Sequence, residues 1–151
     1  MPEGHRATVD RYVRALQSGD LDAQDETLHD DFQEGYPQSG ERIVGKVNRR
    51  AILRHFTENM GSPLPKVDMV MGAEDRWVLS PSFSALHISG TGDEYAVVGR
   101  ATYPDGSEWH IIQLIKMKDG LIWRIRAYFG PPFEPAPWRA DWVELSASVE
   151  S

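Results

Sequence analysis

The segment from Glu108 to Gly130 constrains the fold more than any other, because two long apolar runs flank one short turn, Lys118-Asp119-Gly120. This pattern is typical of a long β-hairpin. Alternate side chains of a strand point to opposite faces of its sheet. One face of the hairpin is therefore apolar around a single amide, and it consists of Trp109, Ile111, Gln113, Ile115, Met117, Trp123, Ile125, Ala127 and Phe129. Such a face requires a cover of other elements.

The opposite face of the hairpin mixes aliphatic side chains with cationic ones. Together with Arg100 from the preceding strand, this face carries His110, Ile112, Leu114, Lys116, Ile122, Arg124, Arg126 and Tyr128. Arginine stems can cover aliphatic surface while their charged heads stay hydrated. A face this apolar more often meets another subunit, and we expect a homodimer through it.

Composition excludes several classes of function. The 151 residues correspond to one domain with a sizeable core, and we expect a single domain over residues 1–151. A net charge of −7 argues against nucleic acid, which requires a basic surface. The chain has no cysteine, no secretion signal and no apolar run long enough to cross a membrane. A cytoplasmic protein without a membrane partner is the expectation.

Three helices are predicted in the first 60 residues. The first covers about residues 8–18, with Val9, Tyr12, Val13 and Leu16 on one side. Asp20 is the expected N-cap of the second, whose inner side carries Leu21, Gln24 and Leu28. Asn48 is the expected N-cap of the third, with Ile52, Leu53, Phe56 and Met60 inward and Arg49, Arg50 and Arg54 outward.

Metal binding is not expected. The acidic cluster Asp22, Asp25, Glu26, Asp30 and Asp31 is interpreted as a solvated helix face, because its carboxylates point in several directions. The five histidines are not spaced from one another, or from carboxylates, as metal ligands on one face.

The remaining pattern predicts strands followed by an extended tail. Strands are expected at residues 32–36, 66–72, 76–79, 83–88 and 94–103, before the hairpin. The tail at 131–151 is rich in proline and aromatic residues; we expect it to wrap over an edge or opening, with 147–151 frayed. Three helices before a meander predict an α+β fold, a cone in which helices on a curved, mostly antiparallel sheet enclose a pocket.

Two sets of residues resemble one superfamily. Residues 11–22, RYVRALQSGDLD, and 126–130, RAYFG, resemble the ketosteroid-isomerase branch of the nuclear transport factor two-like superfamily. Residues 36–45, YPQSGERIVG, with 128–129 and 135–140, PAPWRA, resemble its SnoaL-like proteins. The resemblance covers about residues 6–144 and implies the cone-shaped α+β barrel. It implies little about function, because this fold hosts isomerases, cyclases, hydrolases, dehydratases and binding subunits.

The resemblance places the isomerase site on four positions. Its oxyanion-hole tyrosine falls on Tyr12, which matches, whereas its general-base aspartate falls on Tyr36 and its protonated aspartic acid on Gln113. The acid/base aspartate of SnoaL-type cyclases falls on Ala127. Steroid isomerisation by the aspartate mechanism is therefore not expected here.

Glu34 is the candidate for a replacement base. If Tyr36 faces the cavity, Glu34 shares its face, and desolvation there raises a carboxyl pKa toward a useful range. A salt bridge with an arginine is the structural alternative. Tyr12, Tyr36 and Gln113 are the candidate donors, and His110 becomes the base if the register shifts by one residue.

Ligand contacts are expected from aromatic residues, namely Trp109, Trp123, Phe129 and Phe56, with His55 at the pocket mouth. These rings suit a flat ligand, and they suit a filled core equally well. The first hypothesis is an acid/base enzyme of the isomerase, cyclase, dehydratase or hydrolase type, without a cofactor, acting on a small apolar or aromatic molecule. A binding or carrier protein and a protein-interaction module are the alternatives.

Overall fold

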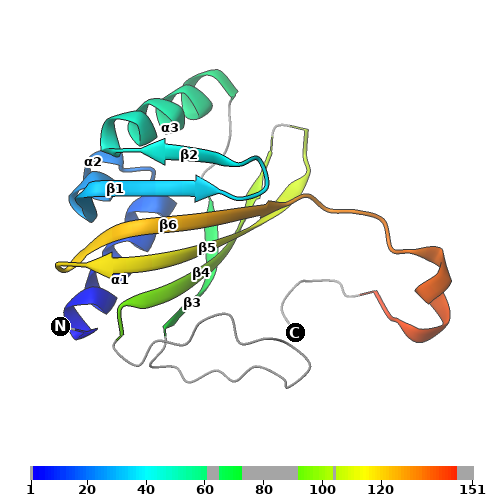
Figure 1. Ribbon diagram of the computed structural model, residues 1–151. Helices are drawn as coiled ribbons and strands as arrows, with labels where there is room; N and C mark the ends of the chain where they lie inside the picture. The colour runs from blue at the N-terminus through cyan, green and yellow to red at the C-terminus, as the bar shows by residue number, and fades with distance from the viewer. Residues whose placement is uncertain (1, 61–64, 73–91, 104, 146–151) are drawn as a thin grey trace.

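The computed structural model describes residues 2–60, 65–72, 92–103 and 105–145 (Figure 1). Helices and strands follow in the order α1 Pro2–Ser18, α2 Leu21–Glu26, β1 Leu28–Tyr36, β2 Glu41–Val44, α3 Lys46–Met60, β3 Lys66–Gly72, β4 Glu94–Thr102, β5 Glu108–Lys118, β6 Leu121–Gly130 and the 3-10 helix η2 Pro137–Trp142. The strands predicted at 76–79 and 83–88 lie outside the described residues.

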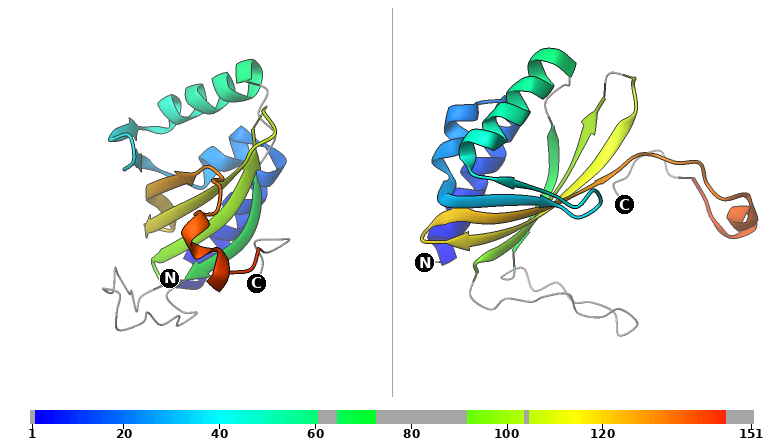
Figure 2. Two further views of the ribbon diagram at one scale, coloured as in Figure 1. Left: turned by 90° about the vertical axis from the view of Figure 1, so that its right-hand side faces the viewer. Right: turned by 45° about the horizontal axis from the view of Figure 1, so that its top comes forward.

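The strands form one six-stranded sheet in the order β2-β1-β6-β5-β4-β3. All neighbouring strands are antiparallel except β1 and β6, which are parallel. The sheet is strongly curved; α1 lies against its inner face and α3 lies beside the β2 edge (Figures 1 and 2). This arrangement confirms the predicted α+β cone, with helices on a mostly antiparallel sheet.

The hairpin of β5 and β6 has the predicted position but a tighter turn and one irregularity. Asp119 and Gly120 form a two-residue turn with φ of 56° and 78°, the left-handed conformation that such hairpins favour. A β-bulge makes Met117 pair with Ile122 and Lys116 with Arg124, so that Trp123 is the extra residue.

This bulge corrects two predicted side-chain directions. Ile122 was expected on the outer face and is instead fully buried in the core. Trp123 was expected on the inner face, and it lies instead between two cations, with Lys118 at 4.9 Å and Arg124 at 3.9 Å from its ring centre. Strict alternation fails here because one extra residue in β6 reverses the facing of the residues that precede Arg124 in this strand.

The core lies between α1 and the inner face of the sheet. Val9, Tyr12 and Val13 from α1 pack with Ile115 and Met117, among others, of the buried cluster. Thr8 fixes the helix to the hairpin turn, since its hydroxyl donates to the Gly120 carbonyl at 2.8 Å. The hydrophobic stripe predicted for the first helix is thus the stripe that the fold buries.

The second and third helices differ from prediction in their ends and facing. Asp20 caps α2 as predicted, accepting from Ala23 N at 3.0 Å, but Leu28 belongs to β1. The third helix begins two residues before Asn48, whose amide donates to Val44 O at 2.8 Å. Arg49 is buried and Ile52 is 44% exposed, the reverse of the predicted facing.

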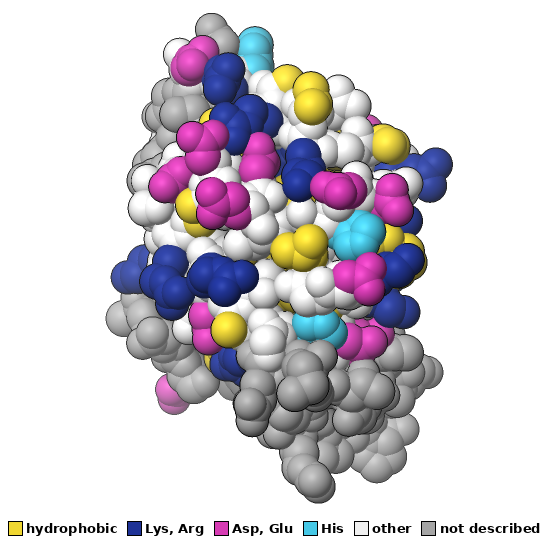
Figure 3. Space-filling model, turned by 90° about the vertical axis from the view of Figure 1, so that its left-hand side faces the viewer, with side chains coloured by type: hydrophobic (Ala, Val, Ile, Leu, Met, Phe, Trp, Pro, Cys, Tyr) yellow, Lys and Arg dark blue, Asp and Glu magenta, His cyan; other side chains and the backbone are white. Residues whose placement is uncertain are grey.

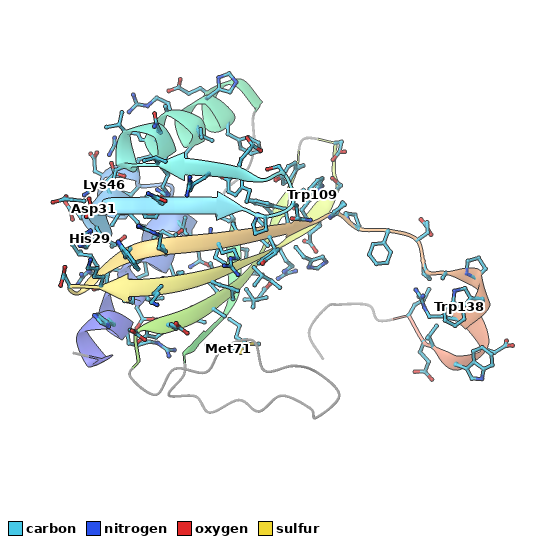
Figure 4. All side chains as sticks on the ribbon, in the orientation of Figure 1. His29, Asp31, Lys46, Met71, Trp109 and Trp138 are labelled. Atoms are coloured by element: carbon cyan, nitrogen blue, oxygen red, sulfur yellow. The ribbon has the colours of Figure 1, made fainter. Side chains whose placement is uncertain are left out.

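The tail leaves the sheet after Gly130 and extends away from the body of the protein (Figures 1 and 2). Trp138 lies far from the sheet and is 71% exposed (Figure 4). The predicted wrapping over an edge or opening is therefore wrong for residues 132–145, whereas Pro131 lines the cavity described below. Prolines 131, 132, 135 and 137 give one reason, because proline favours an extended chain and offers no amide to a sheet edge. Residues 146–151 lie outside the described part.

The acidic cluster is partly neutralised by cations from α3. Arg50 contacts Asp22 at 2.6 Å and Asp25 at 2.7 Å, and Lys46 lies 3.5 Å from Asp30. Figure 3 shows both signs of charge mixed over the end of the molecule that carries α2. Within the described residues no group of three or more potential ligands could hold a metal ion, and no described helix is long and apolar enough to cross a membrane.

Candidate functional site

A cavity of about 800 Å³ lies between the inner face of the sheet, α2 and α3. Its volume is within the range of small-molecule sites. Most lining side chains are apolar; they include Leu16, Leu21, Ile43, Leu53, Phe56, Val67, Val97, Tyr103, Trp109, Ile111 and Phe129. Polar and charged residues also line it, among them Gln24, Gln38, Ser39, Glu41, Arg54, Glu58, Lys66 and Arg100. The polar corner is defined here by four residues of the lining, Glu34, Tyr36, Arg49 and Gln113.

Glu34 comes to the corner from β1, where it pairs with Ile43 on one side and Ile125 on the other. It is only 5% exposed and lines the cavity, so it faces inward as predicted. Burial raises the pKa of its carboxyl, and the nearby Arg49 guanidinium lowers it by less. A carboxyl with this balance can hold a proton closer to neutral pH than an exposed glutamate can.

Arg49 reaches the same corner from the first turn of α3 and is 3% exposed. Its Nη2 donates to Gln24 Oε1 at 2.9 Å, and its Nε lies 3.6 Å from Glu34 Oε1. Its guanidinium also lies 5.7 Å from the centre of the Tyr12 ring. Removing two such charges from water costs several kcal/mol per ion, which explains why attraction does not fully offset burial for Glu34.

Tyr12 fixes the side chain of Gln113 by a hydrogen bond. The Tyr12 hydroxyl donates to Gln113 Oε1 at 2.9 Å, and burial raises the pKa of Tyr12 to about 12. Tyr12 is therefore a neutral donor near pH 7, but it does not line the cavity. It is a positioning residue: with its oxygen engaged by Tyr12, the amide of Gln113 has its nitrogen left to donate to a ligand.

Tyr36 and the aromatic residues complete the lining. Tyr36 contacts Phe129 edge to face at 5.2 Å, and burial followed by the charge of Glu34 raises its pKa. Tyr103 stacks on Trp109 at 4.8 Å and meets Phe56 edge to face at 5.7 Å. Trp109 and Gln113 are four residues apart on one strand, about 13 Å. The cavity thus has an aromatic end and a polar corner.

The structure brings together most of the predicted site residues. Those that line the cavity are Glu34, Tyr36, Gln113, Trp109, Phe129 and Phe56. Trp123 and His55 do not line it; His55 is exposed on α3. His110 pairs with Arg100 and Gly130 on the outer face, so the register that would make it a base is not observed.

Arg49 and Gln24 were not predicted as parts of the site. The third helix was predicted with Arg49 outward, beside Arg50 and Arg54. A signal did exist, since Arg49, Leu53 and Phe56 have the i, i+4 and i+7 spacing of one helix face, and all three line the cavity. Arg49 continues the stripe of Leu53 and Phe56, and the structure places it on the cavity wall.

The fold is that of solved proteins of the nuclear transport factor two-like type. A 24% identical protein of this type, of unknown function, from Burkholderia xenovorans LB400 superposes with a TM-score of 0.69, covering 96% of this chain and 97% of that one. A candidate ketosteroid isomerase from Kribbella flavida DSM 17836 is 22% identical with a TM-score of 0.71 and coverage of 97% and 93%.

The family follows from sequence. The model of the SnoaL-like domain matches residues 9–125, and the chain therefore belongs to the SnoaL-like family. A candidate polyketide cyclase from Xanthomonas campestris pv. campestris is 19% identical, with a TM-score of 0.60 and coverage of 83% and 90%. At these identities the structural likenesses show the fold alone. No curated protein matches the chain.

Proposed function

We propose that the cavity binds a small, largely apolar or aromatic molecule and that Glu34 exchanges a proton with it, without a cofactor. The observation that carries this proposal is a buried carboxyl with a raised pKa on the wall of an apolar cavity. Such a group can act as general acid or base near neutral pH. Isomerase, cyclase, dehydratase or hydrolase chemistry fits this arrangement.

The roles of the neighbouring residues follow from their contacts. Gln113 donates to an oxygen of the ligand, and Tyr12 holds its amide in that orientation. Tyr36 is a second donor on the same strand as Glu34. Trp109, Phe129 and Phe56 contact the apolar part of the ligand.

The test is a screen followed by one substitution. Aromatic and polycyclic compounds are screened for thermal stabilisation of the protein, and those that bind are incubated with it and followed by mass spectrometry. Glu34→Gln keeps the shape of the side chain and is expected to bind the compound while losing roughly 100-fold or more of its turnover. Equal turnover by Glu34→Gln and the unchanged protein would remove Glu34 from this role.

A carrier or binding protein is the second candidate. It is favoured by Gln113 and Ala127, which stand where the resembled enzymes have working carboxylates. Stabilisation by ligands without any turnover would support this candidate.

We further propose that two copies pair through the outer face of the sheet. Support comes from Ile112 and Met69, large apolar residues on that face that remain 42% and 50% exposed. Sedimentation of the purified protein as a dimer, and as a monomer after Ile112→Glu, is the expected result. A monomer at micromolar concentration before any substitution would contradict it.

A further inference from the structure

The guanidinium of Arg49 is buried without enough acceptors. Only Nη2 has a hydrogen bond, to Gln24; across the described residues, Nε and Nη1 have no hydrogen-bond partner. Glu34 is near Nε, but its distance of 3.6 Å is longer than a charged hydrogen bond. Buried polar groups are nearly always paired, so two unpaired nitrogens of one cation require an explanation.

A purely structural arginine in this protein is satisfied differently. Arg50 donates to Asp25 at 2.9 Å and to Asp22 at 2.6 Å, and both of its partners belong to α2. It thereby ties α3 to α2. Arg49, one residue earlier on the same helix, faces the cavity instead and lacks this saturation.

Apart from the oxygen of Gln24, which already accepts from Arg49, the surroundings of the guanidinium offer more donors than acceptors. The oxygen of Gln113 already accepts from Tyr12, which leaves its amide nitrogen, and Tyr36 contributes a hydroxyl. Glu34 is the single carboxyl of the corner. The corner therefore has more N–H and O–H groups than oxygens to receive them, together with the positive charge of Arg49.

We propose that the ligand is an aromatic or polycyclic acid, whose anionic oxygen accepts hydrogen bonds from Arg49 and from the amide of Gln113. This inference rests on the proposed function for the presence of a ligand and adds its chemical class. Charge-assisted hydrogen bonds in a water-poor corner are strong and favour an anion over a neutral isostere. The rings of the acid would extend toward Trp109 and Phe56 at the aromatic end.

The experiment compares two probes of equal shape, 2-naphthoate and 2-naphthamide, by isothermal titration calorimetry. The unchanged protein is expected to bind 2-naphthoate at least tenfold more tightly than the amide. Arg49→Gln is expected to lose this preference, whereas Arg50→Gln, the matched control on the same helix, keeps it. The comparison of the two probes on the unchanged protein needs no variant to fold.

Each outcome has one meaning. Equal binding of both probes, or a preference that survives Arg49→Gln, overturns the inference and leaves the proposed binding function intact. Binding of neither probe overturns both. A preference for 2-naphthoate, in a protein that turns over no compound of the screen, supports the inference and removes the acid/base chemistry alone.

Discussion

Two arginine–carboxylate pairs lie on opposite faces of the same sheet, and they are built differently. On the outer face, where it pairs with His110, Arg100 makes two hydrogen bonds to the carboxylate of Asp68, at 2.8 and 2.7 Å, and the residue also borders the cavity. On the inner face, Arg49 lies 3.6 Å from Glu34 and has two nitrogens without a hydrogen bond in the described structure. The exposed pair has complete geometry, and the buried pair does not.

The pKa values of the two carboxyls shift in opposite directions. Hydrogen bonding to Arg100 holds the pKa of Asp68 below its usual range, because little burial opposes it. Burial raises the pKa of Glu34 despite Arg49. Missing hydrogen bonds are most costly where water is excluded. A ligand that supplies the missing acceptors therefore explains the Arg49–Glu34 pair better than a contribution to the stability of the protein does.

The largest effect is expected from Arg49→Gln. Removing one partner of a buried pair leaves the other unpaired, so the free energy of unfolding should fall by about 3 kcal/mol at neutral pH. Urea denaturation followed by tryptophan fluorescence measures this change. A loss near zero would mean that Arg49 contributes nothing to the folded state, and the contrast between the two faces would then rest on ligand binding alone.

Tyr12→Phe tests how Gln113 is positioned. The substitution retains the buried ring but removes the donor to Gln113 Oε1, and it should cost about 1 kcal/mol of unfolding free energy. A merely structural tyrosine would leave ligand selectivity unchanged. Here the preference for 2-naphthoate over 2-naphthamide is expected to fall, because the amide of Gln113 can rotate. An unchanged preference would argue against positioning through Tyr12.

Much of the fold was predictable because its signals are local and repeated. The hairpin of β5 and β6 follows from alternation and a turn of Asp119 and Gly120, and the stripe of α1 follows from helix spacing. The family resemblance supplied the mostly antiparallel sheet of the cone, but not the strand order. The parallel pairing of β1 and β6 joins segments far apart in sequence, which alternation does not encode.

The errors have separate physical causes. Trp123 and Ile122 exchanged faces because a bulge adds one residue to β6, and nothing in the alternation announces it. The predicted facing of Arg49 was wrong although its spacing from Leu53 and Phe56 places all three on one helix face, because a charged side chain is ordinarily expected in solvent. Successive residues turn by about 100° around a helix, so the face that a residue shares with others is set by its spacing from them and not by where the helix begins.

The candidate site was predictable in part. Glu34, Tyr36 and Gln113 line the cavity as period-two alternation required. The contacts of Arg49 with Gln24 and Glu34 join three elements that are separate in sequence. Long-range contacts of this kind depend on the packing of α3 against β1, which no short motif specifies.

The pH dependence of stability tests the raised pKa of Glu34. A folded state that binds this proton more tightly than the unfolded chain gains stability below the ordinary glutamate pKa of 4.5, and loses it as pH rises through the higher folded-state value. The side chain introduced by Glu34→Gln does not titrate. Relative to Glu34→Gln, the unchanged protein should therefore become less stable between pH 4.5 and 8. Parallel profiles of unfolding free energy for the two proteins would contradict the shift.

The smallest effect is expected from Arg100→Gln, which breaks the pair with complete geometry. Exposed ion pairs gain little because water and salt screen them and because ordering two long side chains costs entropy. The melting temperature should change by no more than about 2 °C, and the preference for 2-naphthoate should stay as it was. Differential scanning calorimetry on Arg100→Gln and Arg49→Gln side by side makes the comparison direct.

If Arg100→Gln costs as much stability as Arg49→Gln, or if it alters ligand preference, the distinction between a structural outer pair and a ligand-oriented inner pair fails. A small loss of stability in Arg100→Gln beside a large loss in Arg49→Gln would mean that good hydrogen-bond geometry alone does not identify the functional arginine. Burial and missing acceptors identify it.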